Sequence, residues 1–299
     1  MAKEKLSILI VTYNQEKYIQ QCLDSILMQH VDFEYEVIIG DDCSTDSTPQ
    51  ICDEYAKKYP FIHVYHHSKN LGHVKNWEFC LNQCKGEYIA ILEGDDYWID
   101  CHKLQKQVDY LDSHSEVALT ITNVQSIYEK GAKERHFIFE SMGECCWKKS
   151  DVCGKEWYIL PSSSLFRNVF KDFSFPKEIY IADSYLFPYL LEITDGITYS
   201  FAEVMTAYRQ HRDNISAKNS LKGTIRWAEQ YKYLGKRFRW GAVGYKRSED
   251  MYLTVLSRAI FPGMLRYRWR YMILHPRKFL SRYLFYTIFD CVKLVCKHD

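Results

Sequence analysis

Three carboxylates fall within four residues at Glu93-Gly94-Asp95-Asp96, directly after the apolar run of residues 88–92. That run has the composition of a strand buried on both faces, so the carboxylates stand together where the strand ends. At such spacing they repel one another unless a positive charge lies between them, and hard divalent cations such as Mg²⁺ or Mn²⁺ prefer carboxylate oxygens. The pattern therefore indicates metal binding. A solvated acidic turn that leads into the next helix is the alternative interpretation.

The first hundred residues contain four short apolar runs, and a polar loop follows each of them. The loops span residues 12–14, 41–46, 68–72 and 93–96. Helical patterns separate the runs, which predicts a parallel sheet with right-handed crossovers. All four loops then meet at the carboxyl edge of the sheet, where such sheets bind ligands. This convergence favours a ligand site over an isolated acidic turn. The absence of GxGxxG and GxxxxGK[ST] patterns argues against a dinucleotide site or a P-loop.

Charge is distributed unevenly along the chain, although the net charge is only +1. From Leu221 onward there are 17 Lys and Arg against 5 Asp and Glu, whereas residues 1–220 hold 22 basic and 33 acidic residues. We therefore expect a catalytic domain at 1–218 and a basic, aromatic, helical region at 219–299. Three interpretations of that region stay open: a surface for anionic membrane lipid, a nucleic-acid surface, or helices that pack on the acidic body or a second subunit.

The membrane interpretation is favoured, because the apolar stripe of the C-terminal region exceeds what a soluble basic face needs. No recognised nucleic-acid module accompanies the basic residues, so no nucleic acid partner is expected. The sequence does not indicate the oligomeric state. We expect no leader segment, since Met1 to Lys5 run straight into the first strand, and no stretch reaches the ~18–20 apolar residues of a membrane span. The expected location is cytoplasmic, with peripheral contact to the cytoplasmic membrane face.

The eleven cysteines are scattered and form no CxxC pair. This usage predicts a reduced protein of the cytoplasm rather than a disulfide framework. Cys145-Cys146 with Cys153 comes nearest to a zinc cluster, but the paired spacing of zinc sites is missing. We therefore do not expect zinc at these three cysteines.

Taken together, the motifs resemble those of the family-2 inverting glycosyltransferases of GT-A fold. The matching segments are Ser7 to Asn14, Asp41 to Asp46, Asn70-Leu71-Gly72 and Glu93 to Trp98, in the order of the family. The resemblance covers about residues 5–215. It implies an α/β fold of the nucleotide-diphospho-sugar transferase, Rossmann-like type: a mixed sheet flanked by helices, here with a C-terminal helical extension.

The resemblance also assigns roles to individual residues. The nucleotide pocket would be lined by Thr12, Tyr13, Asn14, Glu16, Asp41, Asp42, Asn70, Gly72 and Asp95. Asp95 and Asp96 would bind the metal together with His211, and Arg209 would pair with phosphate. Glu93 stands where the family often has aspartate, so it stays open which carboxylate ligates directly. A structural or surface role is the alternative for His211.

Asp183 matches the family's catalytic base, which takes the proton of the acceptor hydroxyl. This chain has Ala182 where the family usually has a second carboxylate. Capping of the following helix is the alternative role for Asp183, and it is compatible with catalysis. The segment of residues 161–167 resembles the one whose hydroxyl residues lie under the acceptor. Trp98 could stack on a sugar ring or fill the core.

The function implied is inverting transfer of a hexose or N-acetylhexosamine from a nucleoside-diphosphate sugar, UDP-linked by expectation. The acceptor would be a hydroxyl of a glycan or of a lipid-linked acceptor in surface polysaccharide biosynthesis, and Mg²⁺ or Mn²⁺ would be the cofactor. Two other classes stay open. A metal-dependent nucleotidyltransferase also sets carboxylates at a sheet edge, and a non-catalytic sugar-nucleotide-binding protein needs only the pocket. The near-complete set of polar loops favours the transferase.

Overall fold

The computed structural model describes residues 4–130, 143–151, 159–212, 214 and 221–238. The expected hairpin near residues 135–140, Cys153 and the region beyond residue 238 lie outside the described residues. A short 3₁₀ helix is labelled η2. The elements in chain order are β1 (Leu6–Thr12), α1 (Ile19–Leu27), β2 (Tyr35–Asp41), α2 (Thr48–Lys58), β3 (Ile62–His66), α3 (His73–Gln83), β4 (Tyr88–Glu93), β5 (Tyr97–Trp98), α4 (Lys103–Ser113), β6 (Val117–Tyr128), β7 (Cys145–Trp147), η2 (Pro161–Ser163), β8 (Leu165–Arg167), α5 (Asp183–Ile193), β9 (Ile197–Gln210) and α6 (Leu221–Arg237).

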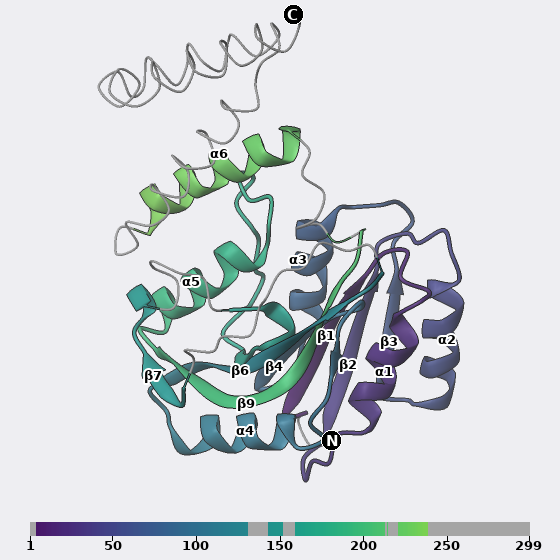
Figure 1. The fold of residues 1–299 in the computed structure, drawn as a ribbon, viewed down its shortest axis with the longest axis horizontal. Helices are drawn as coiled ribbons and strands as arrows, with labels where there is room; N and C mark the ends of the chain where they lie inside the picture. The colour runs from purple at the N-terminus through teal and green to yellow at the C-terminus, as the bar shows by residue number, and fades with distance from the viewer. Residues whose placement is uncertain (1–3, 131–142, 152–158, 213, 215–220, 239–299) are drawn as a thin grey trace, which may run out of the picture. The chain divides into compact units, whose positions relative to one another are not determined.

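One mixed sheet forms the centre of the described fold (Figure 1). Its first four strands pair in parallel in the order β3-β2-β1-β4. Beyond β4, the short β8 pairs antiparallel with both β4 and β6, while β6 and β9 run parallel. β5 and β7 pair antiparallel with β9. The expected α/β class with a mixed sheet is confirmed. The parallel pairing predicted for the four apolar runs of the first hundred residues is confirmed in β1–β4, whereas β8 pairs with β4 in the opposite direction.

The chain changes direction across the sheet at β1. β2 and β3 lie on one side of it, whereas β4 lies on the other. The strand registers set Thr12 beside Asp41 and Val11 beside Glu93. Open α/β sheets bind ligands at such a switch point, outside the carboxyl ends of the strands. The ends of β1 and β4 are therefore where this topology positions a site.

Helices cover both faces of the parallel part of the sheet (Figure 1). Ile8 of β1 packs in one buried core with Leu23 of α1 and Leu104 of α4. On the opposite face α3 approaches β2 so closely that Asn76 Nδ2 donates to the carbonyl oxygen of Gly40 at 2.8 Å. A Cβ atom at position 40 would overlap the Asn76 side chain, so only glycine permits this approach. The strands that carry the site are thus buried on both faces.

The sequence Thr48-Pro49 predicts Thr48 as the N-cap of α2, and the structure differs from this prediction by one residue. In the structure Ser47 is the N-cap, Thr48 is the first helical residue, and Pro49 lies within the first turn. The hydroxyl of Thr48 accepts the backbone N–H of Gln15 at 2.8 Å. Thr48 therefore connects α2 to the loop after β1 rather than capping its own helix.

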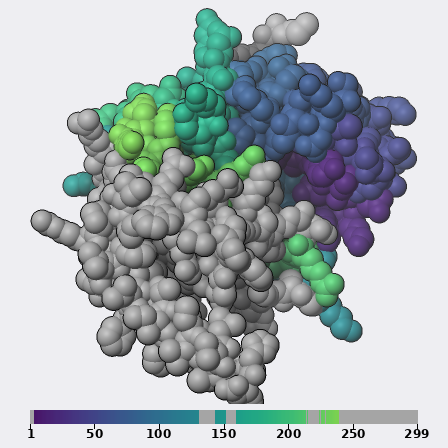
Figure 2. Space-filling view, turned by 90° about the horizontal axis from the view of Figure 1, so that it is seen from above, coloured from purple at the N-terminus to yellow at the C-terminus, as the bar shows by residue number. Residues whose placement is uncertain are grey.

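The chain divides into two compact units, residues 1–218 with 238–241 and residues 219–237 with 242–299. The first unit holds the sheet, and α6 is the described element of the second. Figure 2 shows that, within the first unit, the early segments (purple and blue) and the later segments (teal) lie next to each other on the surface. Among the helices described here, none combines the length and apolar character needed to cross a bilayer. The assignment of 1–218 as catalytic domain and 219–299 as a separate region remains a prediction.

Candidate active site

The acidic loop, residues 93–96, leaves β4 beside the end of β1. Gly94 donates its N–H to the carbonyl oxygen of Val11 at 3.1 Å, and Asp96 donates to that of Glu93 at 2.9 Å, so the chain turns tightly. One carboxylate oxygen from each of Glu93, Asp95 and Asp96 lies within 4.8 Å of the others. Burial and the charges of the neighbouring carboxylates raise the pKa of Glu93 well above its ordinary value. The three carboxylates converge as the sequence pattern predicts.

Asp96 is fully engaged by the protein. Its Oδ2 accepts the hydroxyl of Ser162 at 2.6 Å, and its Oδ1 accepts the backbone N–H of Arg209 at 2.9 Å. The side chain is 1% exposed, and burial followed by the charge of Asp95 raises its pKa well above the ordinary value. Asp96 thus fastens the acidic loop to η2 and β9. By contrast, the carboxylate of Glu93 makes no hydrogen bond or ion pair with any residue that the structure describes.

Asp95 contacts a histidine that lies 116 positions further along the chain. Oδ2 of Asp95 lies 2.9 Å from Nε2 of His211, which follows β9 directly and is buried. The His211 ring packs against Tyr18, with 4.8 Å between ring centroids. The resemblance paired Asp95 and His211 as metal ligands, and the structure brings their side chains together. A surface position for His211, the alternative considered above, is incorrect.

Arg209 lies beside the acidic loop and is held in place by several contacts. Its Nε donates to the carbonyl oxygen of Asp95 at 2.8 Å, and an Nη donates to Oε1 of Gln21 at 2.7 Å. The guanidinium carbon lies 4.8 Å from the ring centroid of Tyr18 and 5.2 Å from that of Tyr97. Two aromatic faces therefore hold a cation next to the carboxylates. Sequence reasoning did not single out Tyr18 or Gln21, which lie in a helix pattern that reads only as amphipathic.

The loops after β1 and β2 are joined by hydrogen bonds. Asn14, whose φ of 53° is left-handed, accepts the N–H of Thr45 at 2.8 Å and donates its own N–H to the hydroxyl of Ser44 at 2.9 Å. Oε2 of Glu16 accepts the N–H of Ser47 at 3.0 Å. Asn14 and Glu16 therefore fix the shape of the predicted nucleotide pocket through their neighbours. Asparagine is among the few residues that adopt such a φ readily.

Thr12 and Tyr13 lie at the end of β1 but differ in exposure. Thr12 is buried, and its hydroxyl donates to Oε1 of Gln15 at 2.8 Å. A Cβ atom at Gly94 would overlap Gln15 and press on Thr12, so the acidic loop crosses the end of β1 closely. Tyr13 is 47% exposed. Its ring offers an apolar face at the carboxyl edge on which a planar base can stack.

Asp42 holds the loop that follows β3. Its Oδ1 accepts the N–H of Leu71 at 2.6 Å, and its Oδ2 accepts the N–H of Gly72 at 3.0 Å. The side chain of Asn70 returns a hydrogen bond to the carbonyl oxygen of Asp42 at 3.0 Å. Gly72 has φ of +84°, a conformation that glycine adopts without a steric penalty. Asp42, Asn70 and Gly72, all assigned to the nucleotide pocket, thus form one connected unit.

Asp41 is directed toward the protein rather than toward the edge of the sheet. It is 2% exposed, accepts the N–H of Ser44 at 3.2 Å, and lies 3.0 Å from Nδ1 of His66. The hydrogen bond to Asp41, together with that to Asp53, raises the pKa of His66 despite partial burial. Asp41 therefore stabilises the loop after β2 through these hydrogen bonds.

Asp183 is the first residue of α5 and comes from the second half of the chain. Burial raises its pKa to about 6, although the backbone N–H of Ser184 lies 2.7 Å from its Oδ1. The charge of Asp183 is one of those that raise the pKa of Glu93, after burial and the charges of Asp95 and Asp96. The helix cap is Ala182 and has no side-chain hydrogen bond. Asp183 is thus the first helical residue rather than the N-cap, and its carboxylate accepts a first-turn N–H.

His73 is a residue of this region that sequence reasoning missed. It begins α3 directly after Gly72, and burial lowers its pKa to about 4, with the charge of Asp95 acting in the opposite direction. A neutral imidazole therefore lies near Asp95. Its position after the Asn70-Leu71-Gly72 turn was the one signal that could have suggested it.

Trp98 lies in the core. It is 1% exposed, its indole N–H donates to the carbonyl oxygen of Ser162 at 2.8 Å, and Nζ of Lys103 lies 4.6 Å from its ring. Stacking on a sugar ring, one of two roles considered for Trp98, is therefore wrong. The hydroxyl of Ser162 also accepts the N–H of Glu93 at 3.1 Å, so this segment supports the acidic loop.

Comparison with known proteins assigns these loops to a family. The family model described as glycosyl transferase family 2 matches residues 7–175. The chain belongs to glycosyl transferase family 2. The match includes the loops after β1, β2, β3 and β4, and it ends before Asp183, Arg209 and His211.

Two curated relatives show how much of this family-2 chain has counterparts. Uncharacterized protein Rv1520 of Mycobacterium tuberculosis is 37% identical over 214 residues, which cover 70% of this chain and 60% of that protein. The poly(ribitol-phosphate) beta-N-acetylglucosaminyltransferase TarS of Staphylococcus aureus is 31% identical over 189 residues, 61% of this chain and 31% of TarS. The chain thus spans less than two thirds of the length of either relative.

Two solved structures share the fold. TarS residues 1–349 of S. aureus in complex with UDP-GlcNAc matches with a TM-score of 0.61 and 20% identity, over 88% of this chain and 78% of that one. The mannosyltransferase PcManGT of Pyrobaculum calidifontis, in complex with GDP-Man and Mn²⁺, matches with a TM-score of 0.54 and 15% identity, over 100% of this chain and 89% of that one. The expected GT-A fold is therefore confirmed.

Proposed function

We propose that this chain transfers a sugar from a nucleoside-diphosphate sugar to a hydroxyl group of a cell-surface glycan, with inversion at the anomeric carbon. One observation carries the proposal: Glu93, Asp95 and Asp96 each place a carboxylate oxygen within 4.8 Å of the other two, at the end of β4. Asp183, the first residue of α5, is the proposed base of the same site, and its charge acts on Glu93. Inverting transfer needs both groups, on opposite sides of the reacting sugar.

The donor class is supported by the relatives. TarS was solved with UDP-GlcNAc, and PcManGT with GDP-Man and Mn²⁺. We propose a UDP-linked hexose or N-acetylhexosamine as donor, because TarS is similar to this chain in both sequence and fold. A polymer of the cell surface, or a lipid-linked precursor of one, is the proposed acceptor. TarS acts on poly(ribitol-phosphate), according to its name, and TuaG of Bacillus subtilis, 33% identical over 136 residues, is named for teichuronic acid biosynthesis.

The acidic loop fits Mg²⁺ or Mn²⁺. Its three carboxylates repel one another, as the raised pKa of Glu93 reflects, and carboxylate oxygens are the ligands that these hard cations take. Glu93 and Asp95 would hold the ion with His211, while Asp96 positions the loop through Ser162 and Arg209. When bound, such a cation supplies Lewis-acid stabilisation of the leaving diphosphate.

Side chains of the protein carry out the other steps of the proposed transfer. As the acceptor oxygen forms its bond to the anomeric carbon, the bond from that carbon to the diphosphate oxygen breaks, and the acceptor proton moves to an oxygen of Asp183. With a pKa of about 6, Asp183 is mainly ionised at neutral pH and can accept that proton. The guanidinium of Arg209, fixed between two tyrosine rings, adds positive charge beside the departing nucleoside diphosphate. A single displacement inverts the anomeric configuration.

Product analysis tests the proposal. The purified chain is incubated with UDP-sugars, a surface-glycan acceptor and MnCl₂, and nucleotide and glycan products are separated. Release of UDP with a lengthened glycan supports the proposal. Pyrophosphate formed from a nucleoside triphosphate would instead identify a nucleotidyltransferase. Tight binding of UDP-sugar with no turnover on any acceptor would identify a sugar-nucleotide-binding protein without catalysis.

We further propose that the basic C-terminal region brings the enzyme to an anionic membrane, where lipid-linked acceptors are found. The proposal is supported by the excess of Lys and Arg from Leu221 onward. The test is flotation with liposomes that contain phosphatidylglycerol. Replacement of Arg266, Arg268 and Arg270 by glutamine should reduce recovery with lipid, and equal recovery of the variant and the parent protein would count against the proposal.

A further inference from the structure

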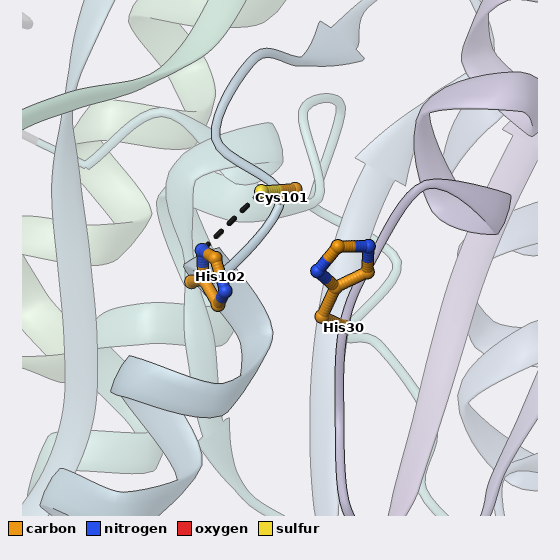
Figure 3. A group of neighbouring side chains, drawn as sticks. All are labelled: His30, Cys101 and His102. Carbon is orange, nitrogen blue, oxygen red and sulfur yellow. Dashed lines mark hydrogen bonds between the residues drawn. The ribbon is translucent and has the colours of Figure 1, made fainter.

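Three donor side chains gather away from the acidic loop, at His30, Cys101 and His102. One ligand atom from each lies within 4.8 Å of the other two, and only one other such group, the acidic loop, occurs in the described part of the chain. Figure 3 shows His30 across from Cys101 and His102, which come from a different segment. These residues have no part in the proposed transfer.

The two segments that carry the donors are fastened together. His30 donates its backbone N–H to the carbonyl oxygen of Cys101 at 2.8 Å. The buried Gln29 side chain donates to the carbonyl oxygen of Asp100 at 2.8 Å and accepts the N–H of Leu104 at 3.1 Å. Three hydrogen bonds thus fix the backbone on both sides of the cluster. Ligands on such a fixed backbone need little further ordering when an ion binds.

Local contacts also orient the side chains. The sulfur of Cys101 lies 3.2 Å from Nδ1 of His102 (Figure 3), and the rings of His30 and His102 meet edge to face with centroids 5.3 Å apart. Asp100 accepts the backbone N–H of His102 at 2.7 Å, and Lys106 pairs with the other oxygen of Asp100 at 3.0 Å. Around zinc, bonds of about 2.0–2.3 Å separate neighbouring ligand atoms by about 3.3–3.7 Å. The three donor atoms already lie within 4.8 Å of one another.

The donor set selects the kind of metal. Two imidazoles and a thiol suit borderline or soft ions, whereas Mg²⁺ and Mn²⁺ prefer the oxygens of the acidic loop. We propose that His30, Cys101 and His102 bind a zinc ion, with solvent as the fourth ligand. His30 and His102 are exposed and Cys101 is half-buried, so both the ion and a water molecule have access.

A zinc ion here would join the end of α1 to the start of α4. α1 begins next to Tyr18 and carries Gln21, both of which contact Arg209 in the candidate active site. The ion would therefore fix the C-terminal end of α1, while Gln21 near its start and the preceding Tyr18 contact Arg209. Because zinc would bind the folded state, it would raise the thermal midpoint by an amount that grows with the logarithm of the zinc concentration relative to Kd.

Cobalt serves as the spectroscopic probe, because a cysteine ligand gives Co²⁺ a thiolate charge-transfer band that oxygen ligands do not give. Metal-free full-length protein is titrated with CoCl₂ in the presence of excess MgCl₂, which competes for the acidic loop. We expect a thiolate band that saturates at one equivalent and disappears when ZnCl₂ is added. Cys101→Ser should abolish the band, and His30→Gln should weaken Co²⁺ binding by at least about tenfold, since even lost supporting partners weaken metal sites by 10- to 100-fold.

The matched control is the double variant Cys145→Ser, Cys146→Ser, which changes two free cysteines elsewhere on the described surface. It should keep the band and its affinity. Loss of the band in this control, or its persistence in Cys101→Ser, would overturn the proposal. Unchanged Co²⁺ affinity in His30→Gln would do so as well. Because His30 is exposed, that variant remains informative if Cys101→Ser fails to fold.

Discussion

Nε2 of His211 lies 2.9 Å from Oδ2 of Asp95, although 116 positions separate the two residues in the chain. The contact joins the loop after β4 to the residue that follows β9. The family match ends at residue 175, so Asp95 lies inside it and His211 outside. The candidate site therefore brings together residues from both halves of the fold.

Replacing His211 tests whether this contact serves metal binding. In His211→Asn the imidazole next to Asp95 is lost, and we expect the Mn²⁺ concentration for half-maximal transfer to rise about 10- to 100-fold. The measurement is the initial rate of nucleotide release as a function of MnCl₂ concentration. His63→Asn, at an exposed position on β3, is the matched control and should leave this dependence unchanged. Parental Mn²⁺ dependence in His211→Asn would remove His211 from the metal site.

Asp183 should govern the pH dependence of transfer. Its pKa of about 6 means that the ionised, proton-accepting form is lost as the pH falls through about 6. We expect kcat/KM to be level above about pH 7 and to fall tenfold per pH unit below about pH 5. Asp183→Asn should lower kcat by at least about 10²-fold at neutral pH, because general-base catalysis contributes about 10²–10⁴-fold. A pH profile that is the same in Asp183→Glu and in Asp183→Asn would contradict this role.

The same substitution should not weaken the fold. The folded-state pKa of Asp183 lies above its ordinary value of 3.8, so the folded state binds a proton more tightly than the unfolded state, and ionisation at neutral pH opposes folding. Asparagine removes the charge and can keep the hydrogen bond from the N–H of Ser184. Asp183→Asn should therefore raise the free energy of unfolding by about 1–2 kcal/mol at pH 7, and by progressively less as the pH falls toward 4. Urea unfolding at several pH values measures this.

The hydroxyl of Ser162 should stabilise the acidic loop more than the hydroxyl of the nearby Ser164 does. Its hydroxyl donates to Asp96 and accepts the N–H of Glu93, so Ser162→Ala leaves two buried groups unpaired. We expect the free energy of unfolding to fall by about 1–3 kcal/mol, measured by urea denaturation. Ser164→Ala is the control: its hydroxyl donates to the carbonyl oxygen of Pro161, which also accepts the N–H of Ser164. Equal losses in the two variants would argue against a special role for Ser162.

The loops of the candidate site could be predicted from the sequence because their geometry follows from strand direction alone. Thr12, Asp41 and Glu93 each end a short apolar run, and parallel pairing of β1 with β2 and β4 brings those ends together. No detailed packing is needed for that inference. The family resemblance added the expectation that Asp183 and His211 belong to the same site, which no local pattern of residues indicates.

The roles within the acidic loop could not be predicted in this way. Asp95 and Asp96 are adjacent and chemically identical, but Asp96 is engaged by Ser162 and Arg209, 66 and 113 positions away. Such partners depend on how β8 and β9 enter the sheet. His73 was missed for a related reason: its pKa near 4 arises from burial, and a histidine at the start of an amphipathic helix looks the same whether it is buried or exposed.

Lys103 should make stability depend on pH in a direction opposite to that of Asp183. It is 0% exposed, its Nζ donates to Oε1 of Gln107 at 2.6 Å, and burial lowers its pKa from 10.5 to about 7. Between pH 7 and 10.5 the unfolded state therefore binds a proton that the folded state lacks, so stability rises with pH. Relative to Lys103→Met, the parent protein should gain up to about 2–3 kcal/mol of unfolding free energy between pH 7 and 9.

Urea unfolding of the two proteins at pH 7, 8 and 9 measures that gain, with Lys75→Met as control because Lys75 is exposed on α3. The control should show no comparable change relative to the parent. The ring of Trp98, 4.6 Å from Nζ of Lys103, favours the charged ammonium and so works against the effect of burial. If the difference in unfolding free energy between the parent and Lys103→Met does not vary with pH, Lys103 stays protonated in the core. The attraction of the Trp98 ring for the ammonium group would then outweigh the effect of burial.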